Sequence, residues 1–130
     1  MIPVSGHLLS EEKKKQQNSE VKFLESLIDN RRICIIGPIR QEILSGIKDK
    51  KQFTELKDIL GSFDDFQIIT GDYELAAEYF NTCRNKGIQG SNTDFLICAV
   101  SHRKRFPIFT TDKDFEKFSR HITITLIKNY

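Results

Sequence analysis

The sequence of 130 residues has no run of about 18 apolar residues, so we expect no membrane-spanning helix. Its first residues hold too short an apolar stretch for a secretory signal peptide. Neither sign of charge predominates, because 20 basic and 18 acidic residues leave a formal net charge of only +2. This balance excludes a histone-like polycation and leaves room for local basic clusters that meet phosphates.

Cysteine is scarce and no CxxC spacing occurs, which argues against a disulfide framework or a zinc site. Cys34, Cys83 and Cys98 each stand in an apolar pattern. They predict buried, reduced thiols of a cytoplasmic protein. The length predicts a single domain over residues 1–130, in which residues 1–17 form an irregular segment.

Short apolar runs alternate with apolar residues at helical spacing. The runs at 33–36, 66–69 and 107–110 predict strands, and the strictly alternating stretch 122–126 predicts an edge strand. Helical patterns cover 21–28, 38–47, 53–60, 72–86 and 94–100, with a short helix after Phe115. Strands that alternate with helices predict an α/β fold, a three-layer sandwich with a mainly parallel sheet.

Three acidic residues follow strand ends or stand at helix starts: Glu42, Asp94 and Asp112. Ligands bind beyond the carboxyl ends of parallel strands, so we expect these carboxylates to converge on one rim. Crowded like charges destabilise a fold unless a cation neutralises them, and ligand sets made only of oxygen suit Mg²⁺ or Mn²⁺. Such a site performs metal-assisted phosphoryl transfer. For Glu42 alone, a surface charge near a helix N-terminus is the simpler reading.

Neighbouring residues are weaker candidates for the same site. Asp114 is a further metal ligand or, equally well, a solvated charge at a helix start. Thr110 or Thr111 could orient a carboxylate or a water, although threonine at a strand end is usually present only because it favours the strand conformation. The basic clusters 31–32 and 102–105, with Arg103, Lys104 and Arg105, either follow an RNA backbone or form solvated turns.

Three segments resemble the second, third and fourth acidic motifs of PIN domains, and most closely those of the VapC-type toxins of bacterial toxin–antitoxin pairs. They are PIRQEILSG at 38–46, GSNTDFLICA at 90–99 and TTDKDF at 110–115. The resemblance runs from about Ser19 to the C-terminus. It implies an Mg²⁺- or Mn²⁺-dependent endoribonuclease that cuts structured RNA such as tRNA or rRNA. It also implies homodimers and a cognate antitoxin, with Glu42, Asp94 and Asp112 as metal ligands and Asp114 as a lesser one.

The sequence departs from this pattern at its start. PIN domains begin with an apolar strand that ends in an aspartate, whereas this chain opens MIPVSG and has no acid before Glu11. The first central strand and its aspartate are therefore expected to be missing, as if by truncation, and we expect weak or no nuclease activity. A degenerate PIN module that binds RNA or antitoxin without cutting is the alternative. A phosphate-sensing receiver domain ranks third, because the acidic pair and late lysine that it needs are not evident.

Overall fold

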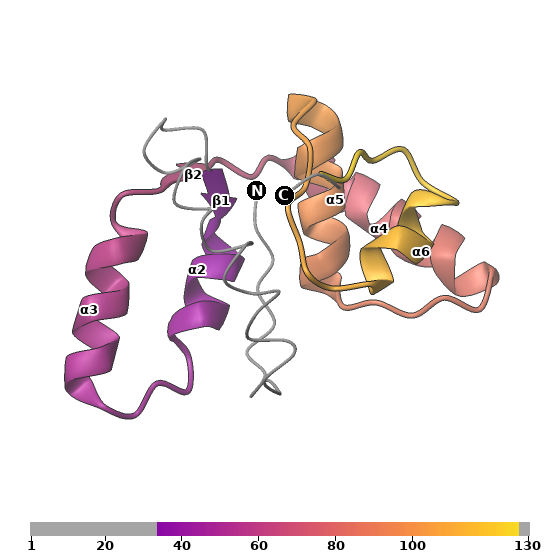
Figure 1. Cartoon of the computed structure of the whole chain (residues 1–130). Helices are drawn as coiled ribbons and strands as arrows, with labels where there is room; N and C mark the ends of the chain where they lie inside the picture. Colours follow the sequence, from indigo (N-terminus) through magenta and orange to yellow (C-terminus); the bar gives the residue numbers. More distant parts are fainter. Residues whose placement is uncertain (1–33, 128–130) are drawn as a thin grey trace.

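The computed structural model describes residues 34–127 (Figure 1). Three predictions lie outside these residues: the irregular or truncated segment 1–17 with its missing strand, the helix at 21–28, and the basic pair Arg31–Arg32. They stay predictions.

A small parallel sheet joins β1 (Cys34–Ile36) to β2 (Asp64–Phe66). Cys34 pairs with Asp64 and Ile36 pairs with Phe66. A second parallel contact joins Ile108 to Leu126, where Ile108 N donates to Thr125 O at 2.8 Å. The α/β class with parallel pairing is confirmed. The three-layer arrangement stays a prediction, because residues 34–127 contain only this two-stranded sheet and the isolated bridge.

The second strand differs from its prediction, which placed it at 66–69. It ends at Phe66 because its partner Ile36 is the last residue of β1, and α2 begins at Gly37, so no strand residue remains to pair with Gln67. The polar groups that follow Phe66 have other partners. Gln67 O accepts a hydrogen bond from Arg103 Nη2 at 2.8 Å, and Ile69 N donates to Asp72 Oδ2 at 3.0 Å. The predicted strands at 107–110 and 122–126 likewise shrink to the single bridge between Ile108 and Leu126.

Five helices account for most of the described residues: α2 (Gly37–Leu44), α3 (Lys50–Leu60), α4 (Thr70–Asn85), α5 (Asn92–Lys104) and α6 (Asp114–Ser119). Pro38 stands in the first turn of α2, where its missing N–H costs nothing. Asp49 caps α3 by accepting from Lys51 N at 2.9 Å. In Figure 1, α2 and α3 run beside each other below the small sheet, and α4, α5 and α6 form the second group of helices.

Helix α5 is the centre of the core. All of its residues from Phe95 to Ser101 are buried, because the run from Phe95 to Val100 is apolar around most of the helix circumference. It packs chiefly along α4, and the Phe95 ring lies 4.7 Å from the Phe118 ring of α6. Fully burying one such side chain contributes about 1.5–3 kcal/mol. The same apolar cluster includes Ile35 and Ile36 of β1, so the sheet and helices share one core.

Arg40 of α2 links the pair of helices α2 and α3 to the small sheet. Its guanidinium donates to Leu60 O at 2.7 Å and Phe63 O at 3.1 Å, and it pairs with Asp65 at 2.8 Å. The planar, multiply donating guanidinium suits such a junction better than a lysine would. The sequence pattern did not reveal this role.

The three cysteines are free thiols, with Cys83 and Cys98 buried and Cys34 half-buried. Burial raises the pKa of all three thiols, so each is held as the unreactive thiol. Among residues 34–127, no helix is long and apolar enough to cross a membrane.

Candidate metal centre

Asp94 is held at the first turn of α5 by a capping box. Its N–H donates to Ser91 Oγ at 3.0 Å, and its Oδ2 accepts from Ser91 N at 3.1 Å. Two N–H groups that the helix leaves unpaired are thereby satisfied. Ser91 is therefore the N-cap of α5, and the capping box fixes the Asp94 carboxylate at the helix start.

Asp112 is held by a tight turn after the Ile108 bridge. Its N–H donates to Thr110 Oγ1 at 3.0 Å, and its Oδ1 accepts from Asp114 N at 2.9 Å, the first residue of α6. Thr110 therefore supports the backbone that carries Asp112. Thr111 is exposed and forms no hydrogen bond within residues 34–127.

The acids at the starts of α5 and α6 interact electrostatically. Burial raises the pKa of Asp94, and the negative charges of Asp112 and Asp114 raise it further, while hydrogen bonds from Ser91 oppose the shift. Like charges near a partly desolvated carboxylate have this effect. Three of the predicted metal ligands, from two segments of the chain, therefore share one neighbourhood.

The remaining acid, Glu42, is exposed on α2 and has no hydrogen bond or ion pair within the described residues. It is not among the charges that shift the pKa of Asp94. Asp114 lies 3.7 Å from Lys117 Nζ in an ion pair that is half exposed. The roles of all four acids as ligands stay predictions.

The model of the PIN domain family matches residues 7–121 of the chain. This chain belongs to the PIN domain family. The match covers most of the sequence and includes the three acidic segments described above. PIN domains are generally nucleases that use divalent metal ions. A comparison with curated proteins found no match.

The acids of this PIN domain fit a hard cation in their chemistry. Asp94, Asp112 and Asp114 offer only oxygen, and each ionised carboxylate has about four acceptor sites, of which the capping and turn bonds use few. The raised pKa of Asp94 shows that negative charge at this position lacks full compensation. As they stand, no three acidic, histidine or cysteine side chains of residues 34–127 are grouped closely enough to enclose a metal ion.

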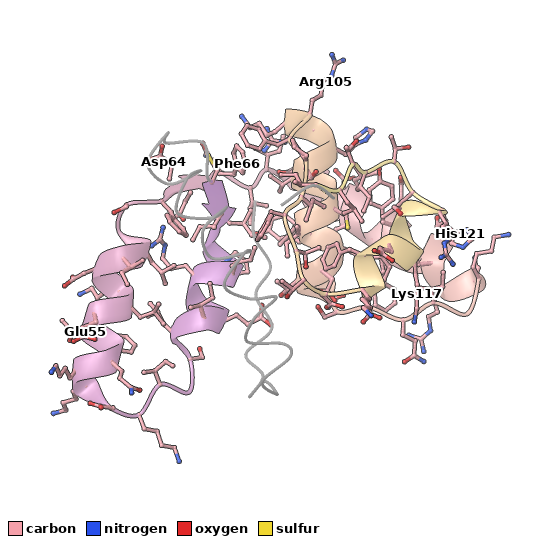
Figure 2. All side chains as sticks on the ribbon, viewed as in Figure 1. Glu55, Asp64, Phe66, Arg105, Lys117 and His121 are labelled. Atoms are coloured by element: carbon pink, nitrogen blue, oxygen red, sulfur yellow. The ribbon has the colours of Figure 1, made fainter. Side chains whose placement is uncertain are left out.

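The predicted RNA-binding residues lie at the other end of α5 from Asp94. Arg105 lies eleven positions after Asp94, a rise of roughly 16 Å along a helix. Arg105 projects from the C-terminal end of α5 (Figure 2), and Lys104 Nζ lies 5.8 Å from the centre of the Phe66 ring. Any RNA that contacts both ends of α5 must span this distance.

Arg103, the third predicted RNA-binding residue, has a structural partner that the sequence analysis missed. Its Nε donates to Asp72 Oδ1 at 2.7 Å and its Nη2 donates to Asp72 Oδ2 at 2.9 Å. Asp72 is only 1% exposed. RNA contact by Arg103 stays a prediction, but its guanidinium is already committed to a buried carboxylate. An aspartate at the start of the helix predicted at 72–86, ahead of its apolar face, was the available signal.

Proposed function

We propose that this PIN domain is a metal-dependent endoribonuclease that cleaves structured RNA, such as tRNA or rRNA. The observation that carries the proposal is that a capping box fixes Asp94 at the start of α5 and a tight turn fixes Asp112 just before α6, where the negative charge of Asp112 adds to burial in raising the pKa of Asp94. Partly buried carboxylates that raise the pKa of a neighbour destabilise a fold, so their presence together favours a function that needs them.

Asp94 and Asp112 would hold the metal, with Glu42 and Asp114 as further ligands. A Mg²⁺ or Mn²⁺ ion held there would supply activation of a water and stabilisation of charge on the leaving oxygen of the phosphodiester. The capping box at Ser91 and the turn at Thr110 keep the first two carboxylates in place without the ion. Preorganised ligands of this kind reduce the cost of rearrangement during the reaction.

RNA would meet the basic end of α5 as well as the acids. Arg105 and Lys104 are exposed cations that form no ion pair within residues 34–127, and they suit contacts to the phosphate backbone. Such contacts position RNA without reading its sequence.

The VapC-like motifs support a more specific biological role. We propose that the protein acts in the cytoplasm as the toxin of a type II toxin–antitoxin pair, as a homodimer and in complex with a cognate antitoxin. We also propose that the whole chain is one domain with the three-layer sandwich of its family. These proposals rest on the motif resemblance and on membership of the PIN family.

The decisive test is cleavage of a folded tRNA by residues 1–130 with Mg²⁺, with Mn²⁺ and with EDTA. We expect cleavage only with metal and its loss in Asp94→Asn and Asp112→Asn. Asp58→Asn on α3, an exposed aspartate without an ion pair in the described part of the chain, is the matched control. Cleavage that persists in Asp94→Asn or in EDTA would refute the proposal. RNA binding without cleavage would favour the alternative, a degenerate PIN module that does not cut. The rate of cleavage in the same assay also tests the expectation, drawn from the sequence, that nuclease activity is weak or absent.

A further inference from the structure

A hollow of about 150 Å³ lies between the end of α4, the segment that follows it and the start of α5. Its walls are formed by Phe80, Arg84, Ile88, Gln89, Gly90 and Phe95. None of these residues belongs to the acidic site described above. The hollow nevertheless adjoins that site in the chain, because Gly90 directly precedes Ser91, whose capping box holds Asp94.

The segment that forms one wall of the hollow is fixed at both ends. At the end of α4, Gly87 adopts a φ of 75°, Gly87 N donates to Arg84 O at 2.9 Å, and Ile88 N donates to Cys83 O at 2.9 Å. This is the Schellman arrangement, which terminates a helix with a left-handed residue. At the other end, the capping box of Ser91 begins α5. The wall is therefore set before any ligand arrives.

Gly90 packs directly against the rings of Phe118 and Phe95. A Cβ at this position would lie 2.6 Å from Phe118 Cζ and 2.9 Å from Phe95 Cε2. Any other residue at position 90 would have to displace a ring. The absence of a side chain here lets the segment approach the rings and leaves the adjacent space open.

The walls combine flat apolar surfaces with a cation and an amide. The rings of Phe80 and Phe95 lie 5.6 Å apart at an interplanar angle of 75°, and Arg84 Cζ lies 5.7 Å from the centre of the Phe80 ring. Arg84 is exposed and has no ion pair or side-chain hydrogen bond within residues 34–127. Unstacked bases of RNA loops are recognised by aromatic rings, arginine planes and polar side chains of this kind.

We infer that the hollow binds one unstacked nucleobase of an RNA loop. The base stacks on the half-buried Phe80 ring and on the Arg84 guanidinium beside it, and Gln89 offers its amide to the base edge. The Phe95 ring, 1% exposed, supports the Phe80 ring. The flanking backbone then lies next to the start of α5 and its carboxylate at Asp94. This inference rests on the proposed function, since it names the part of the RNA that the site takes.

The test compares two fluorescein-labelled RNA hairpins in EDTA, one with a six-nucleotide loop and one in which the loop nucleotides are abasic. We expect wild-type protein to bind the base-bearing hairpin about tenfold more tightly, the size of effect that base–aromatic stacking produces. Phe80→Leu keeps an apolar wall but removes the ring, and Arg84→Gln removes the exposed cation. Both variants should reduce the tenfold preference to less than about threefold.

Arg105→Gln is the matched control for loss of charge, because it removes an arginine at the opposite end of α5. It should weaken binding of both hairpins while keeping the preference at about tenfold. Circular dichroism checks that each variant is folded. Because Arg84 is exposed, its replacement leaves the core intact even if Phe80→Leu unfolds the protein.

The outcomes separate the inference from the proposed function. A preference that persists in Arg84→Gln and Phe80→Leu would overturn the inference and leave metal-dependent cleavage untouched. Equal binding of both hairpins by wild-type protein would also overturn it. That result would favour a different occupant of the hollow, an apolar side chain of a protein partner. Failure to bind either hairpin would overturn inference and function together. A preference that depends on the hollow, without cleavage in Mn²⁺, would support the inference and refute the nuclease proposal.

Discussion

The ion pair between Asp72 and Arg103 gives the sharpest prediction about stability. Arg103→Met keeps much of the side chain's length and apolar stem but leaves the Asp72 carboxylate, 1% exposed, without its cation. Breaking a buried pair by removing one partner costs about 3–5 kcal/mol. Since Arg103 is itself 29% exposed, water partly replaces it, and we expect the lower end, about 3 kcal/mol. At about 4 °C per kcal/mol, the melting temperature should fall by about 12 °C.

Urea unfolding followed by circular dichroism measures this loss directly. Arg120→Met makes the same chemical change at an exposed arginine with no ion pair among the described residues, and it should stay within about 0.5 kcal/mol of wild type. Asp72→Asn retains an acceptor for Ile69 N and removes the buried charge. In that background Arg103→Met should cost clearly less, with a coupling of about 1–3 kcal/mol. A loss below about 1 kcal/mol for Arg103→Met alone would refute the reasoning.

The pH dependence of the loss follows from the pKa of Asp72. Burial alone would raise this pKa, but hydrogen bonds from Arg103 and Ile69 N and the nearby positive charges outweigh burial and lower it. The pair therefore stabilises the fold above the unfolded pKa, about 4, and this contribution disappears as the pH falls through the lower folded value. In Arg103→Met, burial dominates and protonation relieves the cost. The gap between variant and wild type should narrow from about pH 7 to below about pH 4.

Three further substitutions test other parts of the structure. Without metal, Asp94→Asn should raise the melting temperature at neutral pH, because burial and neighbouring charges disfavour the ionised carboxylate. This gain should vanish as the pH falls through the raised pKa of Asp94 in the wild-type protein. A lower melting temperature for the variant at neutral pH would contradict the electrostatic interaction of Asp94 with Asp112 and Asp114. Gly90→Ala should cost about 1–3 kcal/mol in urea unfolding, because its Cβ would meet the Phe118 ring, whereas Gly71→Ala, with open space around its Cβ, should not. Arg105→Gly should raise stability by about 1 kcal/mol, because Arg105 has a φ of 55°, and should weaken RNA binding; an unchanged melting temperature would exclude strain there.

The sequence alone determined the features that depend on local spacing. The helices predicted at 38–47, 72–86 and 94–100 are present as α2, α4 and α5, because each pattern depends on residues within one or two turns of each other. The apolar run from Phe95 to Val100 stands in the helix predicted at 94–100, and all of it is buried in the structure. The order and spacing of the acidic segments were enough to indicate the PIN family, which the family comparison confirmed.

Tertiary structure alone decided which polar groups meet. Asp72 and Arg103 are 31 residues apart, and Arg40 and Asp65 are 25 apart, so no periodicity in the sequence links the members of either pair. Residues 67 and 69, predicted to belong to the second strand, follow it and bond to the same pair: Gln67 O accepts from Arg103 and Ile69 N donates to Asp72. Buried charges and backbone groups must find partners, and the nearest partner in space belongs to whichever distant segment the fold brings alongside.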